Sequence, residues 1–360
     1  MSFNAKQVTR RTFVGGAGLA IAAGLVACGG KSTTKGGTSG TSSEDRSGNV
    51  YWLNFKPEMD EAIQSLGKKY MEKYPKVKVK IVTAASGTYT QTLTSEMDKQ
   101  GAPTLFVIGN MEGVKTWSDY AMDLKDTAIA KELSTDDYNL TDDSGKLVSI
   151  PYNYEAFGIA VNTELIEKAG HKMDDIKDFN SLKKVVEDIH SRASELGFDA
   201  FVATDMDDSS SWRVTGHLTN IVCYYDSRDA GGWKQAPATI SDKYIPNYKN
   251  LYDLAINNST VAPNALATGG HDPVTEFTGK KAAFIFSGSF NYADIKKGGV
   301  TSTACIPYYC GVQGEEKAGL NCGTENRWAI NDNASEEDKQ ATMDFMVWLV
   351  TDPDAAAAMV

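Results

Sequence analysis

Asn49-Val-Tyr-Trp-Leu-Asn-Phe55 and Lys76-Val-Lys-Val-Lys-Ile81 are the two runs that decide the fold. The first is mostly apolar, as in a strand buried on both faces, and the second alternates strictly, as in a strand whose lysine face is wet. Between them, Pro57 leads a segment with apolar residues at helical spacing, which are Met59, Ala62, Ile63, Leu66 and Tyr70. A further helix at roughly 90–99 precedes the apolar run 104–108. This alternation predicts an α/β fold with a largely parallel sheet.

The body of the chain runs from about residue 48 to Val360, which is too long for one compact core and suits two domains. Near its end, Ser335 precedes a segment that carries Ala341, Phe345, Trp348 and Leu349 on one helical face. We therefore expect a final helix that begins with a serine cap. No segment after residue 27 is long and apolar enough to span a bilayer.

Residues 1–27 have the three parts of a secretory signal: a positive start, an apolar Gly/Ala-rich stretch from Val14 to Ala27, and a small-residue cleavage site. The stretch is too short and too rich in glycine for a stable spanning helix. Thr9-Arg10-Arg11-Thr12-Phe13 resembles a twin-arginine export signal, and Leu25-Val26-Ala27-Cys28 resembles a bacterial lipobox, in which the cysteine is acylated. We expect an exported protein, anchored by lipid on Cys28 at the extracytoplasmic face of the cell membrane.

Residues 28–47 are predicted to form a flexible tether, because Gly, Ser, Thr and a few charges cannot bury enough apolar surface to become ordered. The formal net charge of the chain is −11. It becomes −14 once residues 1–27, with three positive charges and no negative ones, are removed. Because phosphate binding depends on basic patches, this acidity argues against nucleic acid as a partner.

Four cysteines remain once Cys28 is assigned to lipid, and they allow three pairings if all are bridged. Cys310 and Cys322 flank a turn-rich stretch that suits a hairpin loop, so we expect a disulfide between them, with unpaired buried thiols as the alternative. No metal site is expected, because no histidine accompanies the spacing of Cys305, Cys310 and Cys322.

Four stretches carry a family pattern: Tyr74-Pro75-Lys-Val-Lys-Val79; Gly101-Ala-Pro-Thr-Leu-Phe106; Ile150-Pro-Tyr-Asn-Tyr-Glu-Ala-Phe-Gly-Ile-Ala-Val-Asn162; and Phe277-Thr-Gly-Lys-Lys-Ala-Ala-Phe-Ile-Phe-Ser-Gly-Ser-Phe290. With these four stretches in this order, the chain resembles the extracellular solute-binding proteins of ABC importers (family 1). Within that family it resembles the sugar-binding group related to maltodextrin-binding protein. The resemblance covers essentially the whole mature chain. The sequence departs from the family pattern at Thr104, Val161 and Phe290, where aspartate, tyrosine and tryptophan are usual.

The resemblance implies a periplasmic-binding-protein-like (type II) fold, with two α/β lobes joined by a hinge and the ligand held between them. It assigns residues 48–153 and 307–350 to lobe 1, and 158–304 and 353–360 to lobe 2. Chain crossings are accordingly expected near 153–158, 305–309 and 351–353. Family members usually continue with further helices, so whether the chain is truncated at Val360 stays open.

Candidate ligand contacts follow from what a sugar needs, which is flat aromatic faces for its C–H surfaces and fixed donors and acceptors for its hydroxyls. Ligands of open α/β sheets bind at the carboxyl ends of strands. Asn54, Phe55 and Lys56 end the first strand, and Asn110 and Glu112 follow the apolar run 105–108. These are our candidates at strand ends, with ordinary strand-end packing as the alternative.

Further candidates lie where the family resemblance places the ligand. It implies a ligand-binding carboxylate at Glu155, where an ion pair is the structural alternative. Trp212 matches an aromatic region of the cleft, and Phe290 keeps a stacking surface. Glu325, Asn326 and Trp328 follow Gly323 in an irregular stretch and complete the set. The histidines His171, His190, His217 and His271 occur singly, and we interpret each as solvated or core.

The resemblance implies a receptor that binds an oligosaccharide and delivers it to the permease subunits of an ABC transporter, as a monomer and without a cofactor. The same fold carrying iron, a polyamine or a peptide is the alternative. A lipoprotein glycosidase is a third reading, because 47 acidic residues are enough to supply a pair of carboxylates, but the chain has no H-E-x-x-H, no G-x-S-x-G and no recognisable Cys/His pair. We therefore expect a binding protein and not an enzyme. The sequence does not reveal the sugar or its linkage.

Overall fold

The computed structural model describes residues 46–207, 209–232 and 237–359. The expected signal segment 1–27, the lipidation residue Cys28 and the tether up to residue 45 lie outside the described residues. At the end of the expected tether, Arg46 and Ser47 already contact the folded body. Arg46 Nε lies 3.3 Å from a carboxylate oxygen of Asp344, and Ser47 Oγ donates to Glu337 at 2.5 Å.

The first lobe is built on a six-stranded sheet with the strand order β2-β1-β3-β11-β5-β4. Its strands are β1 (Gly48–Asn54), β2 (Val77–Thr83), β3 (Leu105–Val107), β4 (Leu140–Thr141), β5 (Leu147–Pro151) and β11 (Arg327–Ile330). β1 pairs in parallel with β2 and β3, while β11 pairs antiparallel with β3 and β5, and β4 antiparallel with β5. The sheet is therefore mixed, and the expected largely parallel arrangement holds only for its first three strands.

Helices cover both faces of this sheet. One face packs on α1 (Asp60–Lys73), α11 (Glu336–Thr351) and α12 (Pro353–Ala358), and the other on α2 (Tyr89–Met97) and α3 (Met111–Trp117). The predicted helical stripe is confirmed, because Ile63, Leu66 and Tyr70 are buried on α1. The serine cap is also confirmed, since Ser335 Oγ accepts from the backbone N–H of Asp338 at 3.1 Å.

Thr104, which stands where the family usually has aspartate, keeps an oxygen acceptor for the sheet. Its hydroxyl accepts from the backbone N–H of Tyr51 at 3.0 Å and lies 2.7 Å from the hydroxyl of Thr342 on α11. The buried hydroxyl therefore satisfies the backbone N–H of Tyr51, and it does so without burying a charge as an aspartate would.

The second lobe is built on a five-stranded sheet with the order β10-β6-β8-β7, in which β9 also pairs with β6. Its strands are β6 (Glu155–Asn162), β7 (Asp199–Phe201), β8 (Ala282–Gly288), β9 (Thr303–Ile306) and β10 (Asn321–Gly323). β9 and β10 both run antiparallel along β6, opposite its later and earlier residues respectively. The chain leaves the sheet between them as a long excursion.

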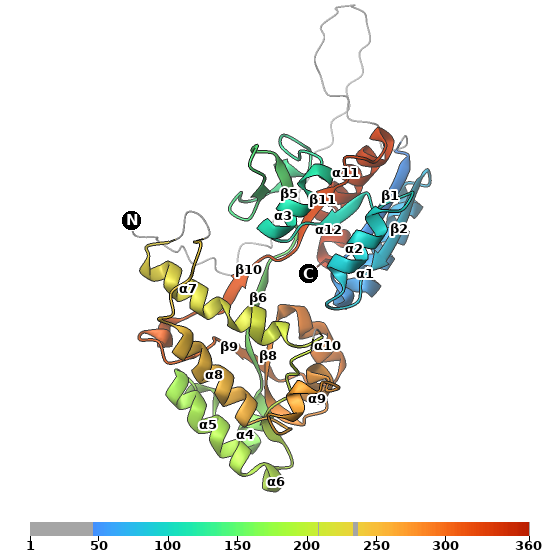
Figure 1. Ribbon diagram of the computed structural model, residues 1–360. Coiled ribbons are helices and arrows are strands. Elements are labelled where there is room, and N and C mark those ends of the chain that lie inside the picture. Colours follow the sequence, from blue (N-terminus) through green and yellow to red (C-terminus); the bar gives the residue numbers. More distant parts are fainter. Residues whose placement is uncertain (1–45, 208, 233–236, 360) are drawn as a thin grey trace, which may run out of the picture. The chain divides into compact units, whose positions relative to one another are not determined.

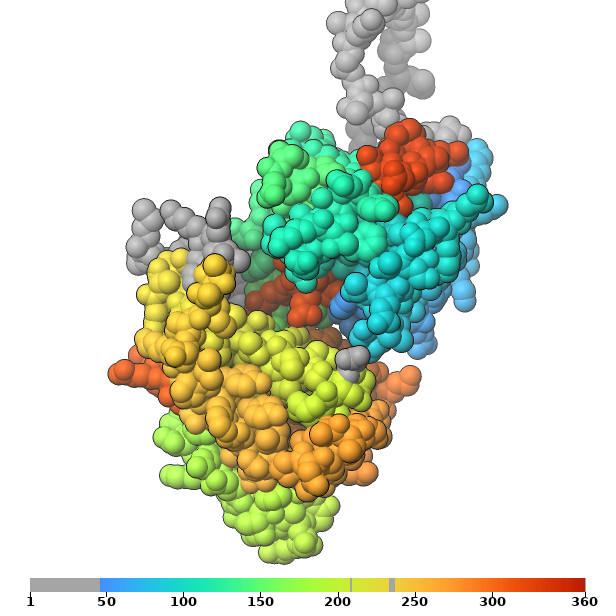
Figure 2. All heavy atoms as spheres, in the orientation of Figure 1, coloured from blue at the N-terminus to red at the C-terminus, as the bar shows by residue number. Residues whose placement is uncertain are grey.

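The larger core of this lobe lies under α4 (Thr163–Lys168), α5 (Phe179–Ser191), α6 (Ala193–Leu196), α7 (Asn220–Asp229), α8 (Ile245–Asn257) and the π-helix η5 (Arg213–Leu218). The other face of the sheet packs on α9 (Pro273–Thr278) and α10 (Tyr292–Lys297). α5 and α8 lie side by side (Figure 1). In the space-filling view, α5, α7, α8 and α9, coloured yellow-green to orange, lie on the surface of the lobe on the face drawn (Figure 2).

Short 3-10 helices complete the chain at η1 (Pro57–Met59), η2 (Ser118–Tyr120), η3 (Ala130–Glu132), η4 (Met173–Asp175), η6 (Ala265–Ala267), η7 (Ser289–Asn291) and η8 (Glu315–Lys317). Among the described residues, no helix combines the length and the apolar character needed to cross a bilayer.

Two crossings join the lobes, and they lie next to each other. The first runs from β5 to β6 through residues 152–154, close to the expected position, and the second runs from β10 to β11 through residues 324–326. Gly323 of β10 pairs with Glu155 of β6 in the second-lobe sheet, and the hydroxyl of Thr324 lies 3.4 Å from Oδ1 of Asn153.

The other two expected crossings are wrong. Tyr308, Tyr309, Cys310 and Val312 are buried in the core of the second lobe, so the segment after 306 stays there up to β10. At the end of the chain, Ala355 of α12 is buried in the first-lobe core with α1 and α11. In both places, the core in which the apolar residues are buried determines the lobe to which the segment belongs. The boundaries at 307 and 353, which the family resemblance implied, disagree with this burial.

Candidate functional site

The second lobe and the second crossing line an open cavity of about 640 Å³. Its walls come from the start of β6, from η5 and α7, from η7, and from two stretches of the chain around β9 and β10. The described residues that line it are Glu155, Phe157, His217, Asn220, Ile221, Cys223, Tyr224, Tyr225, Ser227, Phe290, Pro307, Tyr308, Ala318, Gly319, Leu320, Asn321, Cys322, Gly323, Thr324 and Glu325. The volume is within the range that holds a small ligand.

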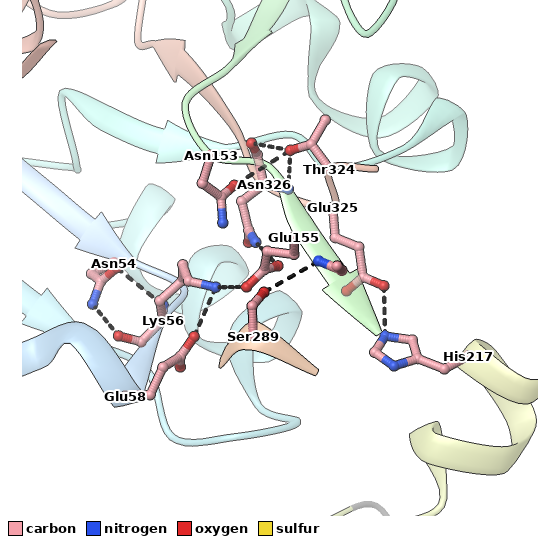
Figure 3. Close-up of polar contacts among 11 residues, drawn as sticks. Asn54, Lys56, Glu58, Asn153, Glu155, His217, Ser289, Thr324, Glu325 and Asn326 are labelled. Carbon is pink, nitrogen blue, oxygen red and sulfur yellow. Dashed lines mark hydrogen bonds and ion pairs between the residues drawn. The ribbon is translucent and has the colours of Figure 1, made fainter. Parts of the chain in front are cut away.

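Glu155 stands at one side of this cavity and is held by a lysine of the first lobe. Lys56 Nζ donates to Glu155 Oε1 at 2.5 Å and lies 2.7 Å from Glu58 Oε1 (Figure 3). Burial by itself would lower the pKa of Lys56, but Glu58 and Glu155 hold that pKa above its ordinary value. A charged, buried ammonium therefore bridges the end of β1 and the start of β6. Asn54, which is fully buried, fixes the turn by accepting from the Lys56 N–H and donating to its carbonyl.

Glu325 faces the cavity from the second crossing and is paired with His217. The two side chains lie 2.8 Å apart between Oε1 and Nε2 (Figure 3). The hydrogen bond with His217 lowers the pKa of Glu325, although partial burial acts in the opposite direction. Glu325 therefore remains a carboxylate at neutral pH, and its side chain is 54% exposed.

An aromatic cluster forms the wall beside this pair. Phe157 stacks on the His217 ring with centroids 4.1 Å apart, and Phe290 lies 5.7 Å from the same ring. Trp212 meets His217 edge-on at 5.0 Å and Phe290 at 5.6 Å. Trp212 and His217 are five residues apart, and the i→i+5 geometry of η5 brings positions at that spacing onto one side. Aromatic faces and carboxylate oxygens thus meet at one cavity, as sugar binding requires.

Glycine at position 288 lets Phe290 reach this wall. A Cβ on Gly288 would lie 2.5 Å from the carbonyl oxygen of Ala156 and 2.6 Å from Cε1 of Phe290. Real side chains do not tolerate such contacts with backbone. The Gly-Ser-Phe sequence is therefore explained by the close approach of η7 to the start of β6.

Two buried polar atoms near the cavity have no hydrogen-bond partner among the described residues. They are the hydroxyl of Tyr308, a residue that lines the cavity and is 6% exposed, and Oδ1 of Asn326, which is 1% exposed. Burial raises the pKa of Tyr308 well above its ordinary value, so its hydroxyl keeps its proton. Unsatisfied buried polar groups are rare, and both atoms lie out of contact with solvent.

The predicted site residues divide between the lobes. Glu155, Phe290 and Glu325 line the cavity, and Trp212 packs behind Phe290 and His217. Asn110 caps α3 by accepting from Gly113, Glu112 is exposed and pairs with Lys115, and Phe55 packs on Tyr89. None of these first-lobe residues lines the cavity described here. Trp328 is buried against Trp52 and stacked on Tyr152, so the structure gives it a core role.

Sequence reasoning missed Phe157, His217 and Tyr308. His217 was interpreted as a solvated or core histidine, but it is 8% exposed, lines the cavity and pairs with a carboxylate. A π-helical turn has no simple periodic signature, so the spacing of Trp212 and His217 gave no signal.

The expected disulfide between Cys310 and Cys322 is not formed, because both are free cysteines in the structure. Cys310 is fully buried in the second-lobe core, whereas Cys322 is exposed on β10 opposite Ala156. The described cysteines, histidines and acidic residues include no group of three or more that could hold a metal ion.

Solved structures with the same fold include three binding proteins. BlMnBP1, from an ABC transporter of Bifidobacterium animalis subsp. lactis, in complex with mannobiose, is 18% identical and covers 87% of this chain and 74% of its own, with a TM-score of 0.66. An ABC substrate-binding protein from Listeria monocytogenes in complex with cycloalternan is 15% identical, with coverage of 87% and 78% and a TM-score of 0.64. The GacH receptor of Streptomyces glaucescens is 17% identical, with coverage of 88% and 79% and a TM-score of 0.63.

These likenesses establish the two-lobed solute-binding fold, and no curated protein matches the sequence. A family model described as bacterial extracellular solute-binding protein matches residues 65–360, which is most of the chain. The match confirms the resemblance found in the sequence, and the chain belongs to the family of bacterial extracellular solute-binding proteins.

Proposed function

We propose that this protein is the receptor of an ABC importer and binds an oligosaccharide in the cavity of the second lobe. The observation that carries the proposal is the meeting of stacked aromatic rings, Phe157, His217 and Phe290, with the carboxylates Glu155 and Glu325 around one cavity. Structural relatives in complex with raffinose, mannobiose and cycloalternan support a sugar as the ligand class.

Within this proposal, Phe290 stacks on a sugar face and Glu155 and Glu325 accept hydrogen bonds from hydroxyls. Trp212 supports Phe290 from behind. The receptor is anchored through lipid on Cys28 at the extracytoplasmic face and passes its ligand to membrane-embedded permease subunits as a monomer.

A receptor fits the carboxylates better than a glycosidase. Glycoside hydrolysis needs one carboxylic acid that is protonated at working pH to donate to the leaving oxygen. The hydrogen bond with His217 lowers the pKa of Glu325, which is the wrong direction for that role. An ionised carboxylate suits the binding of hydroxyl groups.

A sugar panel tests the proposal. The full chain carrying Cys28→Ala is purified without detergent, and its melting temperature is recorded with di- and trisaccharides of different composition and linkage. A ligand that binds only the native state raises the melting temperature by mass action. The best ligand is then titrated by calorimetry and recovered for analysis. Intact sugar and a raised melting temperature support a receptor, cleaved sugar supports a glycosidase, and no response to any sugar argues for another solute.

A further inference from the structure

The charge pattern of the cavity specifies the sugar class further, and we propose that the site prefers carbohydrates bearing a protonated amine and rejects those bearing a carboxylate. This inference rests on the proposed function, because it concerns the same cavity. Among the described lining residues, the permanently charged side chains are Glu155 and Glu325, and none is a lysine or an arginine.

Each of the two carboxylates has an oxygen left for a ligand. Glu155 uses Oε1 for Lys56, and its Oε2 has only Asn326 Nδ2 at 3.5 Å, the outer limit of a hydrogen bond. Glu325 uses Oε1 for His217, and its Oε2 has no hydrogen bond to a described residue. Both free oxygens are acceptors, so they attract donors.

The lysine and arginine side chains near the cavity do not cancel this charge. Lys56 is shared between Glu58 and Glu155, so these three groups together keep one negative charge. Arg213 is 4% exposed and donates to the Phe286 carbonyl and the Ser210 hydroxyl. Arg327 is 8% exposed and donates to two backbone carbonyls of the first lobe. The charged surface that a ligand meets in the cavity is therefore acidic.

The remaining wall also favours a cation. Phe157, Phe290 and Tyr308 contribute aromatic rings to the lining, and such rings attract an ammonium group as well as sugar C–H groups. A uronic acid would place its carboxylate oxygens, which are hydrogen-bond acceptors, against those of Glu155 and Glu325. It would also bring a second negative charge close to theirs at a wall of low dielectric constant.

Matched monosaccharides test the charge preference without assuming a linkage. The probes are glucosamine, glucose, glucuronate and N-acetylglucosamine, with the corresponding galactose series, each titrated into the Cys28→Ala chain at low ionic strength. N-Acetylglucosamine keeps the nitrogen and removes the charge. We expect the amine to bind about tenfold tighter than the neutral sugar, which corresponds to one partly solvated charge pair, and the uronate to bind at least as much weaker. High salt should reduce the difference.

Two variants link the preference to the cavity. Glu325→Gln keeps an acceptor for His217 and removes the charge, so it should weaken amine binding much more than neutral-sugar binding and thereby lose most of the amine preference. Glu187→Gln, on an exposed carboxylate of α5 paired with Lys183 at 3.7 Å, is the matched control and should change neither. Melting temperatures show that both variants are folded.

The outcomes separate the two proposals. Neutral sugars binding as tightly as amines, uronates binding best, or an amine preference that survives in Glu325→Gln would overturn the charge preference and leave a sugar receptor standing. If neither these probes nor the di- and trisaccharide panel bind, the proposed function fails, and the charge preference fails with it.

Discussion

Replacing Lys56 with methionine probes the ionic contact between the lobes. The side chain of Lys56 is 5% exposed, and those of Glu155 and Glu58 are 14% and 18% exposed. Methionine keeps the length of the side chain but leaves two carboxylates facing each other without a cation. Removing one partner of a buried ion pair costs about 3–5 kcal/mol, and the partial exposure of the glutamates favours the lower end. A loss of about 3 kcal/mol would lower the melting temperature of a body this size by roughly 6 °C.

The assay is thermal unfolding of the Cys28→Ala chain with and without Lys56→Met. Lys115→Met is the matched control, because Lys115 is 73% exposed and its pair with Glu112 is a surface pair worth at most about 1 kcal/mol. Adding Glu155→Gln to Lys56→Met should recover part of the loss, since it removes one of the two unpaired charges. Equal melting temperatures for Lys56→Met and Lys115→Met would refute the reasoning.

The pH dependence gives an independent check on the same contact. The pKa of Lys56 is raised in the folded state above its ordinary value of 10.5. The stability that its charge contributes is therefore fully present below pH 10.5 and is lost as the pH rises through the higher folded value. The difference between the parent and Lys56→Met should be constant from neutral pH to about pH 10 and should shrink above it.

Further predictions concern the cavity, the backbone and the anchor. Phe290→Ala should weaken sugar binding by about 1–3 kcal/mol in calorimetry through loss of an aromatic contact, and unchanged affinity would remove Phe290 from the site. Gly288→Ala should destabilise the fold by about 1–3 kcal/mol and weaken ligand binding, whereas Gly216→Ala, where a Cβ meets nothing within 4 Å, should do neither. Cys28→Ala should move the folded protein from the membrane to the soluble fraction, and an unchanged membrane fraction contradicts the lipid anchor. Because the pKa of Glu325 is lowered on folding from 4.5, the stability lost in Glu325→Gln, measured by thermal unfolding, should shrink as the pH falls below about 5.

The scaffold of the first lobe was predictable because its strands and helices bury regular faces. The run 49–55 became β1, with Val50, Trp52 and Leu53 fully buried, and the lysines of 76–81 point to solvent on β2. The same regularity explains why Trp328 was wrongly expected to face a ligand. β11 is buried along its whole length, so its tryptophan enters the core beside Trp52.

The site was harder to predict because its residues come from irregular backbone. Glu155 and Phe290 were identified through family motifs, but His217 reaches the cavity on a π-helical turn, and Tyr308 reaches it on the excursion between β9 and β10. That excursion was assigned to the first lobe, because the lobe boundaries came from the family resemblance. The burial of its apolar residues in the second-lobe core shows that it belongs to the second lobe. Periodic sequence patterns indicate which residues of a helix or strand are buried. They give no information about the irregular segments between these elements. In this protein the aromatic and acidic groups around the cavity gather at those breaks, so regular elements position the site while the irregular segments supply its chemistry.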